Sequence, residues 1–385
     1  MLPLLALALW ALVSTSAHPP TAQGRTVPEG SVQAEPAVLV PPTTALMVHA
    51  RPPSKPPGEA RLTATTRSFA AGAAVDRDLG TGVTALQVES NGPTVASRSR
   101  VLIQRSSGAV SLADLAHETQ RVLLGSYPGL PMVAEDRQQR LLQTEMNAIA
   151  TTDDSGGRSV VARIPVPRAG PVYVDGIPRK GVLRPSATRV AGLISAEAGR
   201  LAFVDNSVNS AMVNLDSGAR LELAHVGFIN DVLLTPSGRV YAIGRDTSRQ
   251  AAAFMLLELD PVALAVVRTL PTPIAVAGGA IDDIHLVLSA DGRLFVYASR
   301  GDSQTAAHHS LLYEVHAATG AFAPITLPDD LGSRITAGPD GALYIFSGPG
   351  RNRVARVNPH NSSVEADVEH LRAPRGTYIL ALFVR

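Results

Sequence analysis

The chain has 385 residues, of which 45% are hydrophobic and 4% aromatic, with 32 glycines, 29 prolines and no cysteine. Its formal net charge is +1 and no stretch combines a basic patch with aromatics, so the composition argues against a nucleic-acid-binding protein. The lack of cysteine excludes disulfides, thiolate metal sites, cysteine nucleophiles and a lipid-modified N-terminal cysteine.

The first 17 residues have the pattern of a secretory signal peptide, although no Lys or Arg precedes the apolar run Leu2–Val13. This run is too short to span a bilayer, and the STSA that follows resembles a small-residue cleavage site ending at Ala17. No later segment is long and apolar enough to cross a membrane. We therefore expect a secreted or periplasmic protein without a transmembrane segment.

Residues 18–60 carry ten prolines, in clusters such as VPP, RPP and KPP. A stretch of this composition stays extended and cannot pack a core. It predicts a disordered, Pro-rich tether between the signal peptide (1–17) and a folded domain that covers residues 61–385.

Short apolar runs then alternate with Gly, Asp, Asn and Pro turns, which is the pattern of an all-β protein. Two early segments fit one blade each of a β-propeller: TALQVESNGPTVAS with SRVLIQRSSGAVS, and PMVAEDRQQRLLQTE with RSVVARIPVPRAGPVYV. Between them, SLADLAHETQRVLLG (111–125) has a capping-box-like spacing of Ser111 and Asp114 and an apolar helical face. We expect a short helix there and regard RQQRLLQTEMNAIA (137–150) as a second helical candidate.

Four later stretches repeat a strand, a tight turn ending in glycine and a second strand. Hairpin turns favour glycine because they need a positive φ. Two more strand-like segments follow each stretch, and four strands per unit of about 40–50 residues are typical of a propeller blade. The stretches are GLISAEAGRLAFVDN, DVLLTPSGRVYAIGR, IHLVLSADGRLFVYAS and RITAGPDGALYIFSG, with turn glycines Gly199, Gly238, Gly292 and Gly341.

The sequence therefore predicts a six-bladed β-propeller of four-stranded antiparallel blades. The terminal segments RLTATTRSF and TYILALFVR are both strand-like. We expect one of them to pair with a blade from the other end of the chain and to close the ring.

Two resemblances support this fold. RITAGPDGALYIF followed by NRVARVNP resembles the repeat of NHL-type and streptogramin-lyase-like propellers, and INDVLLTPSGRVYAIG resembles a blade of the gluconolactonase/paraoxonase-like lactonases. The lyase resemblance implies a strand with Trp and Glu and a catalytic His, whereas the strand in this chain reads LYIFSG. The lactonase resemblance implies a Ca²⁺ in the central channel, held by oxygen ligands at the starts of the inner strands.

Candidate site residues follow from reading where each inner strand begins. Asn230, Asp282 and Asp283 offer oxygens for Ca²⁺, whereas arginines at other strand starts would repel a cation. The alternative is a structural role, in which Asn and Asp form turns and the acidic residues pair with the arginines. The ligand-binding candidates are Arg189, Asn230, Asp231, Asp282, Asp283 and Arg334.

The sequence carries no G-x-S-x-G, H-E-x-x-H, P-loop or G-x-G-x-x-G motif, and it requires no cofactor. We interpret the protein as a monomeric binding module whose partner is a protein, a glycan or a small molecule. One alternative is a lactonase- or esterase-like hydrolase with a channel-bound Ca²⁺. A second alternative is a structural envelope protein without a channel site.

Overall fold

The structure of the protein is a computed structural model, and all the residues that it describes belong to the unit Ala37–Arg385. The predicted signal peptide lies outside the described residues. Side chains are not described at 82, 84–88, 135, 173–178, 189, 275, 281, 282, 300, 301, 308 and 378. The described ranges are 39–51, 60–69, 74–88, 100–125, 133–135, 140–145, 148–153, 157–163, 173–174, 177–178, 189–205, 209–248, 253–275, 281–301, 308–329, 331–346 and 352–385.

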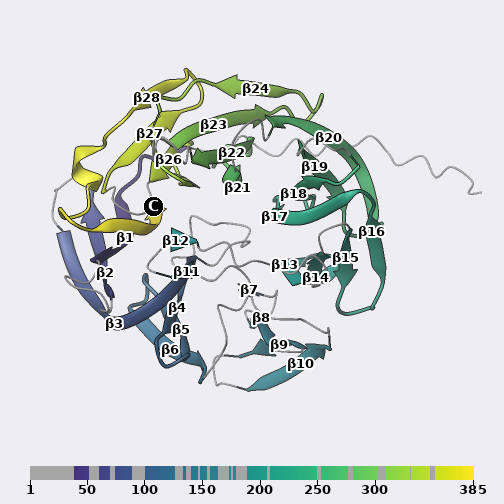
Figure 1. Cartoon of the computed structure of the whole chain (residues 1–385), viewed down its shortest axis with the longest axis horizontal. Coiled ribbons are helices and arrows are strands. Elements are labelled where there is room, and N and C mark those ends of the chain that lie inside the picture. The colour runs from purple at the N-terminus through teal and green to yellow at the C-terminus, as the bar shows by residue number, and fades with distance from the viewer. Residues whose placement is uncertain are drawn as a thin grey trace, which may run out of the picture. The chain divides into compact units, whose positions relative to one another are not determined.

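Antiparallel sheets arranged in a ring make up this unit (Figure 1). One sheet has seven strands in the order β29-β1-β2-β3-β4-β5-β6, and its long strand β3 belongs to two blades. Residues 74–83 of β3 pair with β2, and residues 83–88 pair with β4. Together with five separate four-stranded sheets, this gives seven blades within the described residues.

The first four blades take their strands in chain order, apart from the C-terminal strand, which belongs to blade 1. Blade 1 holds β29 (Tyr378–Val384), β1 (Thr44–Arg51), β2 (Ala60–Ser68) and the first part of β3 (Ala74–Val88). Blade 2 holds the rest of β3, β4 (Arg100–Arg105), β5 (Val110–Asp114) and β6 (Thr119–Leu124). Blade 3 holds β7 (Val133–Glu135), β8 (Leu141–Glu145), β9 (Ala148–Thr152) and β10 (Arg158–Ala162). Blade 4 holds β13 (Arg189–Ala196), β14 (Gly199–Asp205), β15 (Ser210–Asn214) and β16 (Arg220–Leu223).

The last three blades follow in chain order. Blade 5 holds β17 (Val226–Leu234), β18 (Val240–Asp246), β19 (Ala253–Asp260) and β20 (Ala265–Ala275). Blade 6 holds β21 (Ile281–Leu288), β22 (Leu294–Gly301), β23 (His308–Val315) and β24 (Phe322–Ile325). Blade 7 holds β25 (Arg334–Ala337), β26 (Leu343–Phe346), β27 (Val354–Asn358) and β28 (Ser363–Glu365). A two-stranded hairpin, β11 (Tyr173–Val174) and β12 (Ile177–Pro178), and a 3-10 turn, η2 (Glu369–Leu371), complete the described elements.

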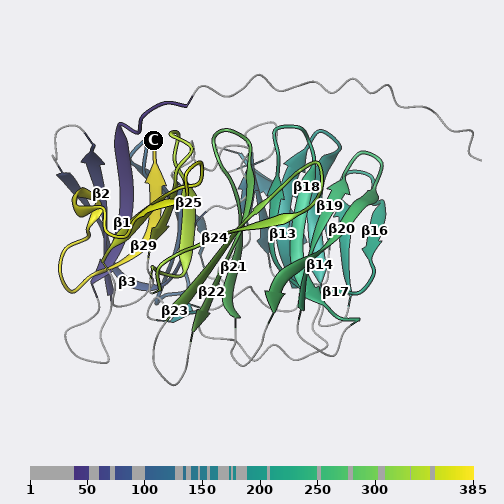
Figure 2. The ribbon, with the colours of Figure 1, turned by 90° about the horizontal axis from the view of Figure 1, so that it is seen from above.

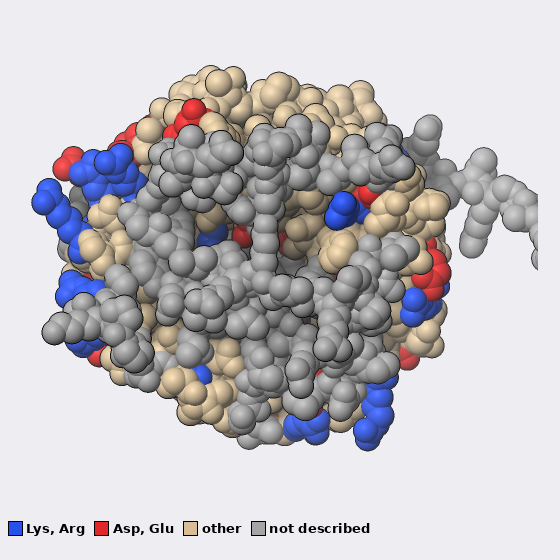
Figure 3. All heavy atoms as spheres, in the orientation of Figure 1, with Lys and Arg blue, Asp and Glu red and all other residues tan. Residues whose placement is uncertain are grey.

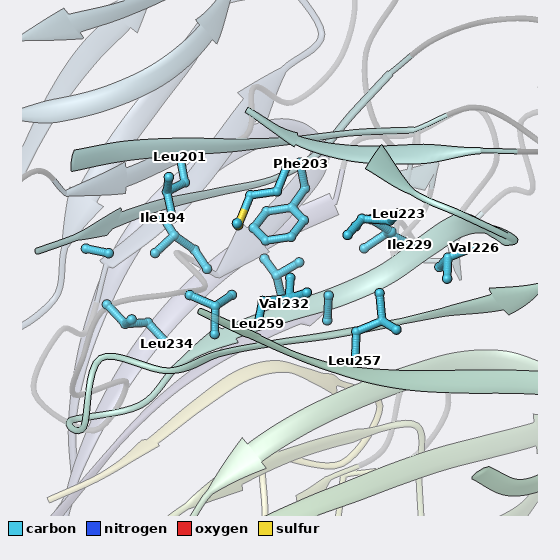
Figure 4. Close-up of a cluster of buried hydrophobic side chains, with 14 residues drawn as sticks. Ile194, Leu201, Phe203, Leu223, Val226, Ile229, Val232, Leu234, Leu257 and Leu259 are labelled. Carbon is cyan, nitrogen blue, oxygen red and sulfur yellow. The ribbon is translucent and has the colours of Figure 1, made fainter. Parts of the chain in front are cut away.

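Seven clusters of buried apolar side chains lie between the blades, one at each junction of the ring. Successive side chains of a strand point to opposite faces of its sheet, so each blade supplies two junctions. In β1, Ala45 and Met47 pack toward blade 7, whereas Leu46, Val48 and Ala50 pack toward blade 2. Figure 4 shows the cluster between blades 4 and 5, and Figure 2 shows the blades from the side.

The prediction of six blades is wrong, and the missing blade is the one that closes the ring. Its strands come from both ends of the chain, so no continuous repeat of 40–50 residues reveals it. The expectation that one terminal segment closes the ring is confirmed, because TYILALFVR forms β29, which pairs with β1 near the other end of the folded unit. The propeller also begins before residue 61, since β1 lies within the expected tether, between two proline pairs.

The predicted helix at 111–125 is wrong, and so is the second helical candidate where it is described. Ser111 and Asp114 lie in β5, and the Asp114 carboxylate accepts hydrogen bonds from the amides of Ala116 and His117 at 3.0 and 3.1 Å. Asp114 therefore forms the turn into β6, where Glu118 has a φ of 55°. The described residues of 137–150 form β8 and the start of β9.

The glycine turns are as predicted. Gly199, Gly238, Gly292 and Gly341 all have positive φ, at 119°, 81°, 81° and 73°. Each lies at the hairpin between the first and second strands of its blade. A residue with a Cβ would be strained in these turns.

We expect Phe383→Ala to destabilise the protein by about 3–5 kcal/mol, the usual cost of truncating a buried aromatic side chain. Phe383 is 1% exposed and lies in the closing strand, in the cluster between blades 1 and 2. Urea denaturation followed by circular dichroism measures the change. Val75→Ala is the control, because Val75 is 67% exposed on β3 and its truncation should cost less than about 0.5 kcal/mol. Equal effects of the two changes would contradict the role of this junction.

The closing blade also contains a buried histidine. His49 is 5% exposed, and its Nε2 lies 2.9 Å from the hydroxyl of Thr65, which donates to Asp76 at 2.6 Å. Burial lowers the pKa of His49; Asp76 opposes this effect, while Arg67 and Arg51 add to it. The folded protein therefore holds His49 neutral, with Nε2–H donating to Thr65.

Acid should destabilise the wild type more than His49→Gln. A histidine pKa that is lower in the folded state means that the unfolded chain binds more protons below about pH 6.5, so folding stability falls as pH falls through that range. Glutamine keeps a donor for Thr65 but cannot titrate. Urea denaturation of both proteins at about pH 7.5 and pH 5.5 isolates the contribution of His49. Identical pH dependence of the two proteins would rule this contribution out.

Candidate functional site

The site lies where the inner strands of the blades meet at the centre of the ring (Figure 1). Contacts run from β7 to β13, and on through β17, β21 and β25 to β29, which also touches β3. Polar side chains near the starts of neighbouring inner strands can therefore approach one another.

Asp231, on β17, joins blade 5 to blade 6. Its Oδ2 accepts a hydrogen bond from the amide of Leu286 on β21 at 2.9 Å, and its Oδ1 accepts one from the amide of Val232 at 2.9 Å. Burial raises the pKa of Asp231 to about 6, while the charge of His285 and the two amides act in the opposite direction. The carboxylate is thus fixed in place and close to protonation at neutral pH.

Asp283 and His285 lie two residues apart on β21 and so share one side of the strand. Nε2 of His285 is 3.3 Å from Oδ2 of Asp283, within ion-pair range although without hydrogen-bond geometry. Burial by itself lowers the pKa of His285, but the charges of Asp283 and Asp231 outweigh it, so the net shift is upward. Burial likewise opposes ionisation of Asp283, yet His285 and Arg334 hold the pKa of Asp283 below its usual range.

Arg334 adds a second cation from the start of β25. Its Nη1 donates a hydrogen bond to the carbonyl of Leu380 on β29 at 2.8 Å, which joins blade 7 to the closing strand. The positive charge of Arg334 acts to lower the pKa of both Asp283 and His285. Three successive blades therefore contribute ionisable groups to one place.

The cluster is deep in the ring but still reaches solvent. The side chains of Asp283 and His285 remain 28% and 29% exposed. Figure 3 shows acidic and basic atoms at the centre of the ring. The charged side chains at the centre of the ring are therefore only partly covered by protein.

The next strand of blade 6, β22, places two buried polar residues opposite Asp283 and His285. Tyr297 lies opposite His285, and Ser299 lies opposite Asp283. The Tyr297 hydroxyl donates to the carbonyl of Gly332 at 2.6 Å. Ser299 is fully buried, and its Oγ has no hydrogen-bond partner among the described residues.

The structure brings together three of the predicted residues, Asp231, Asp283 and Arg334. Asn230 is exposed and directly precedes Asp231. The backbones of Arg189 and Asp282 lie in the inner strands β13 and β21, but their side chains lie outside the described ones. Histidine was not predicted at this site, although the spacing of DDIH places His285 on the same side of β21 as Asp283.

The structure does not test the Ca²⁺ site predicted at Asn230, Asp282 and Asp283, because the side chain of Asp282 lies outside the described ones. Ca²⁺ needs about 6–8 oxygen ligands. No group of three or more His, Asp or Glu side chains that could hold a metal occurs in the described part of the chain. Asp283, moreover, already faces the cations His285 and Arg334. The negative charge of the Asp283 carboxylate is thus compensated by cations of the protein itself.

No protein-family model and no curated protein matches the chain. Solved structures with a similar arrangement include hydrazine synthase of Kuenenia stuttgartiensis, at 14% identity and a TM-score of 0.47 over 78% of this chain and 86% of that one. Oligogalacturonate lyase in complex with manganese has 8% identity and a TM-score of 0.48 over 85% and 86%, respectively. The calcium-binding protein regucalcin of Agrobacterium tumefaciens has 14% identity and a TM-score of 0.41 over 79% and 92%. Likeness at this level carries no information about function.

None of the described helices is long and apolar enough to cross a membrane.

We expect Asp231→Asn to stabilise the protein at alkaline pH. The folded-state pKa of about 6 exceeds the ordinary value of 3.8, so the folded state binds more protons between these values and stability falls as pH rises through them. A shift of about two units corresponds to at most ~3 kcal/mol, and water in the channel reduces this. Asparagine keeps one acceptor, for the amide of Leu286, but its NH2 group would face the amide of Val232, which offsets part of the gain. The variant should therefore gain about 1–2 kcal/mol at pH 8 and show no gain near pH 4.

Urea denaturation across this pH range is the measurement, and Asp283→Asn is the matched control. The pKa of Asp283 is lowered, so its neutralisation should destabilise the protein at pH values where Asp231→Asn stabilises it. An Asp231→Asn variant less stable than the wild type at about pH 8 would show that the charge of Asp231 is favourable in the fold.

Proposed function

We propose that the protein is an exported β-propeller that binds a small ligand at the channel mouth where the inner strands begin. One observation carries this proposal: Asp231, Asp283, His285 and Arg334 converge from three successive blades, while Asp283 and His285 keep more than a quarter of their surface exposed. Export rests on the signal-peptide pattern of residues 1–17.

The energetics of the cluster favour binding over a purely structural role. Apolar residues could fill the centre of a ring at lower cost, because removing charges from water is expensive and ion pairs seldom repay it. The upward pKa shift of Asp231 is such a cost. Unfavourable ionisable groups that reach solvent in a concave place are typical of functional sites.

A second candidate function is acid–base catalysis, as in an ester or lactone hydrolase that works without Ca²⁺. It is favoured by Asp231, whose pKa of about 6 lies near neutral pH, beside the imidazole of His285. A general acid or base is most effective when its pKa is close to the working pH.

The test of the binding proposal follows the His285 imidazole by NMR while small polar compounds are added at millimolar concentration. The panel covers amides, polyols, amino acids, carboxylates and amines, and the His285→Gln variant assigns the signal among the 10 histidines. We expect at least one class to shift the His285 signal in a saturable way. We also expect the double variant Asp283→Asn, His285→Gln to weaken binding of that class, measured by calorimetry, by about tenfold or more, as loss of hydrogen bonds to charged groups predicts.

The matched control is Arg220→Gln, Glu222→Gln, which removes an exposed ion pair from β16 and should leave affinity unchanged. If no class shifts the His285 signal, the binding proposal is refuted. Turnover of lactones or aryl esters that survives a chelator and is lost in Asp231→Asn would favour the catalytic candidate. Turnover that requires Ca²⁺ would favour the predicted metal site.

A further inference from the structure

The two ring nitrogens of His285 have different surroundings. Nε2 is buried and lies 3.3 Å from Oδ2 of Asp283, and it has no hydrogen-bond partner among the described residues. Nδ1 also makes no hydrogen bond to a described residue, but it is not buried, and the side chain is 29% exposed. Because β21 is the innermost strand of blade 6 (Figure 1), this exposed part of the ring lies at the centre of the propeller. Nδ1 is therefore the polar atom of His285 that a ligand can reach.

Asp283 determines which nitrogen keeps its proton. The pKa of Asp283 lies below its usual range, so the carboxylate is ionised at neutral pH and can only accept hydrogen bonds. A lone pair on Nε2 would face this negative charge, whereas an Nε2–H group is attracted to it. The proton of the neutral ring is therefore on Nε2. The proton that the ring gains or loses when it titrates is then on Nδ1.

Two exposed histidines have the opposite arrangement. Nδ1 of His117 lies 3.0 Å from a carboxylate oxygen of Asp114, and Nδ1 of His309 lies 2.8 Å from one of Asp329. In these pairs the carboxylate favours a proton on Nδ1, and Nε2 is the nitrogen that titrates. Both histidines provide internal references for the tautomer of His285.

The position of the His285 ring is fixed by its neighbours. His285 lies opposite Tyr297 on β22, which is fully buried and whose hydroxyl donates to the carbonyl of Gly332 at 2.6 Å. The next residue, Leu286, donates its amide to Asp231 of blade 5 at 2.9 Å. Nδ1 thus has a defined position, as directional recognition of a ligand requires.

A ligand group at Nδ1 faces a donor when the ring is protonated and an acceptor when the ring is neutral. A group that only donates or only accepts fits one of these states, whereas a hydroxyl fits both. We propose that the ligand is a hydroxyl compound, such as a polyol or a saccharide, and that it binds through Nδ1 of His285, with Asp283 as the positioning residue. This inference rests on the proposed binding site.

Three charged groups act on the His285 ring among the described side chains. They are Asp283 on the same strand, Asp231 on β17 and Arg334 on β25. Asp231 has a pKa of about 6, so it titrates within the range in which a histidine changes its charge. The charge state of His285 must therefore be followed directly on the ring.

The test compares polyols and monosaccharides with their O-methyl ethers, which keep the skeleton and the oxygens but cannot donate. Titration calorimetry measures affinity from about pH 5 to about pH 9, and ¹⁵N NMR reports the charge state and the tautomer of His285 at each pH. Where the ring is neutral, we expect the alcohol to bind at least about fivefold more tightly than its ether, as for one hydrogen bond. Where the ring is protonated, both compounds accept from Nδ1–H, and the preference should disappear.

Asp283→Asn tests the positioning role. A carboxamide can donate as well as accept, so it no longer confines the proton to Nε2. We expect a mixture of tautomers in the neutral ring and a loss of most of the preference for alcohols. The control is Asp329→Asn, which makes the same change beside the exposed His309 and should alter the His309 tautomer while leaving affinity unchanged.

The outcomes separate the parts of this inference. A neutral His285 with its proton on Nδ1 would overturn the assignment of the contacting atom. Equal binding of alcohols and ethers at every pH would overturn the ligand class but leave the binding site standing. An unchanged preference in Asp283→Asn would overturn the positioning role, and if this variant fails to fold, the tautomer and the alcohol–ether comparison in the wild type still decide. Absence of any binding would instead refute the proposed function.

Discussion

The pairing of β29 with β1 is the interaction on which the rest of the structure depends. A blade sends alternate side chains to both faces of its sheet, so each face needs a neighbouring blade to cover it. An open row of seven blades would leave two apolar faces exposed to water. Closure by the C-terminal strand covers both, which is why the described residues form seven apolar clusters for seven blades. The cohesion of the ring thus depends on residues from the two ends of the folded unit.

Closure also determines the site, because it brings the starts of the inner strands to one centre. The site residues themselves join those strands: Asp231 binds the amide of Leu286, and Arg334 binds the carbonyl of Leu380. Each of these hydrogen bonds connects one blade to the next. The fold itself therefore holds these side chains in position, so the proposed binding would require little further ordering.

The local pattern of the sequence predicted the β architecture, the glycine turns and the inner-strand starts near Asp283 and Arg334, whereas β17 begins at Val226, before the predicted start at Asp231. Such features depend on neighbouring residues and on a repeat, both of which are visible in one sequence. The number of blades was not predictable in this way, because the closing blade combines strands from both ends and β1 lies between proline pairs. The helix predicted from Ser111 and Asp114 was wrong for a related reason. The same spacing occurs at a helix cap and in a strand followed by an Asp turn, and the pairing of β5 with β6 decides between the two.

His285 shows most clearly what the sequence could not supply. A single histidine in an apolar strand is most often structural, and the residue gains its significance only when Asp231 of the preceding blade and Arg334 of the following blade lie nearby. The charges that act on His285 come from residues as far apart in the chain as Asp231 and Arg334. The Ca²⁺ hypothesis took the arginines at the strand starts into account but not His285, which the ring places beside Asp283 together with Arg334. In a closed ring, what an acidic residue binds is determined by its neighbours across the blades.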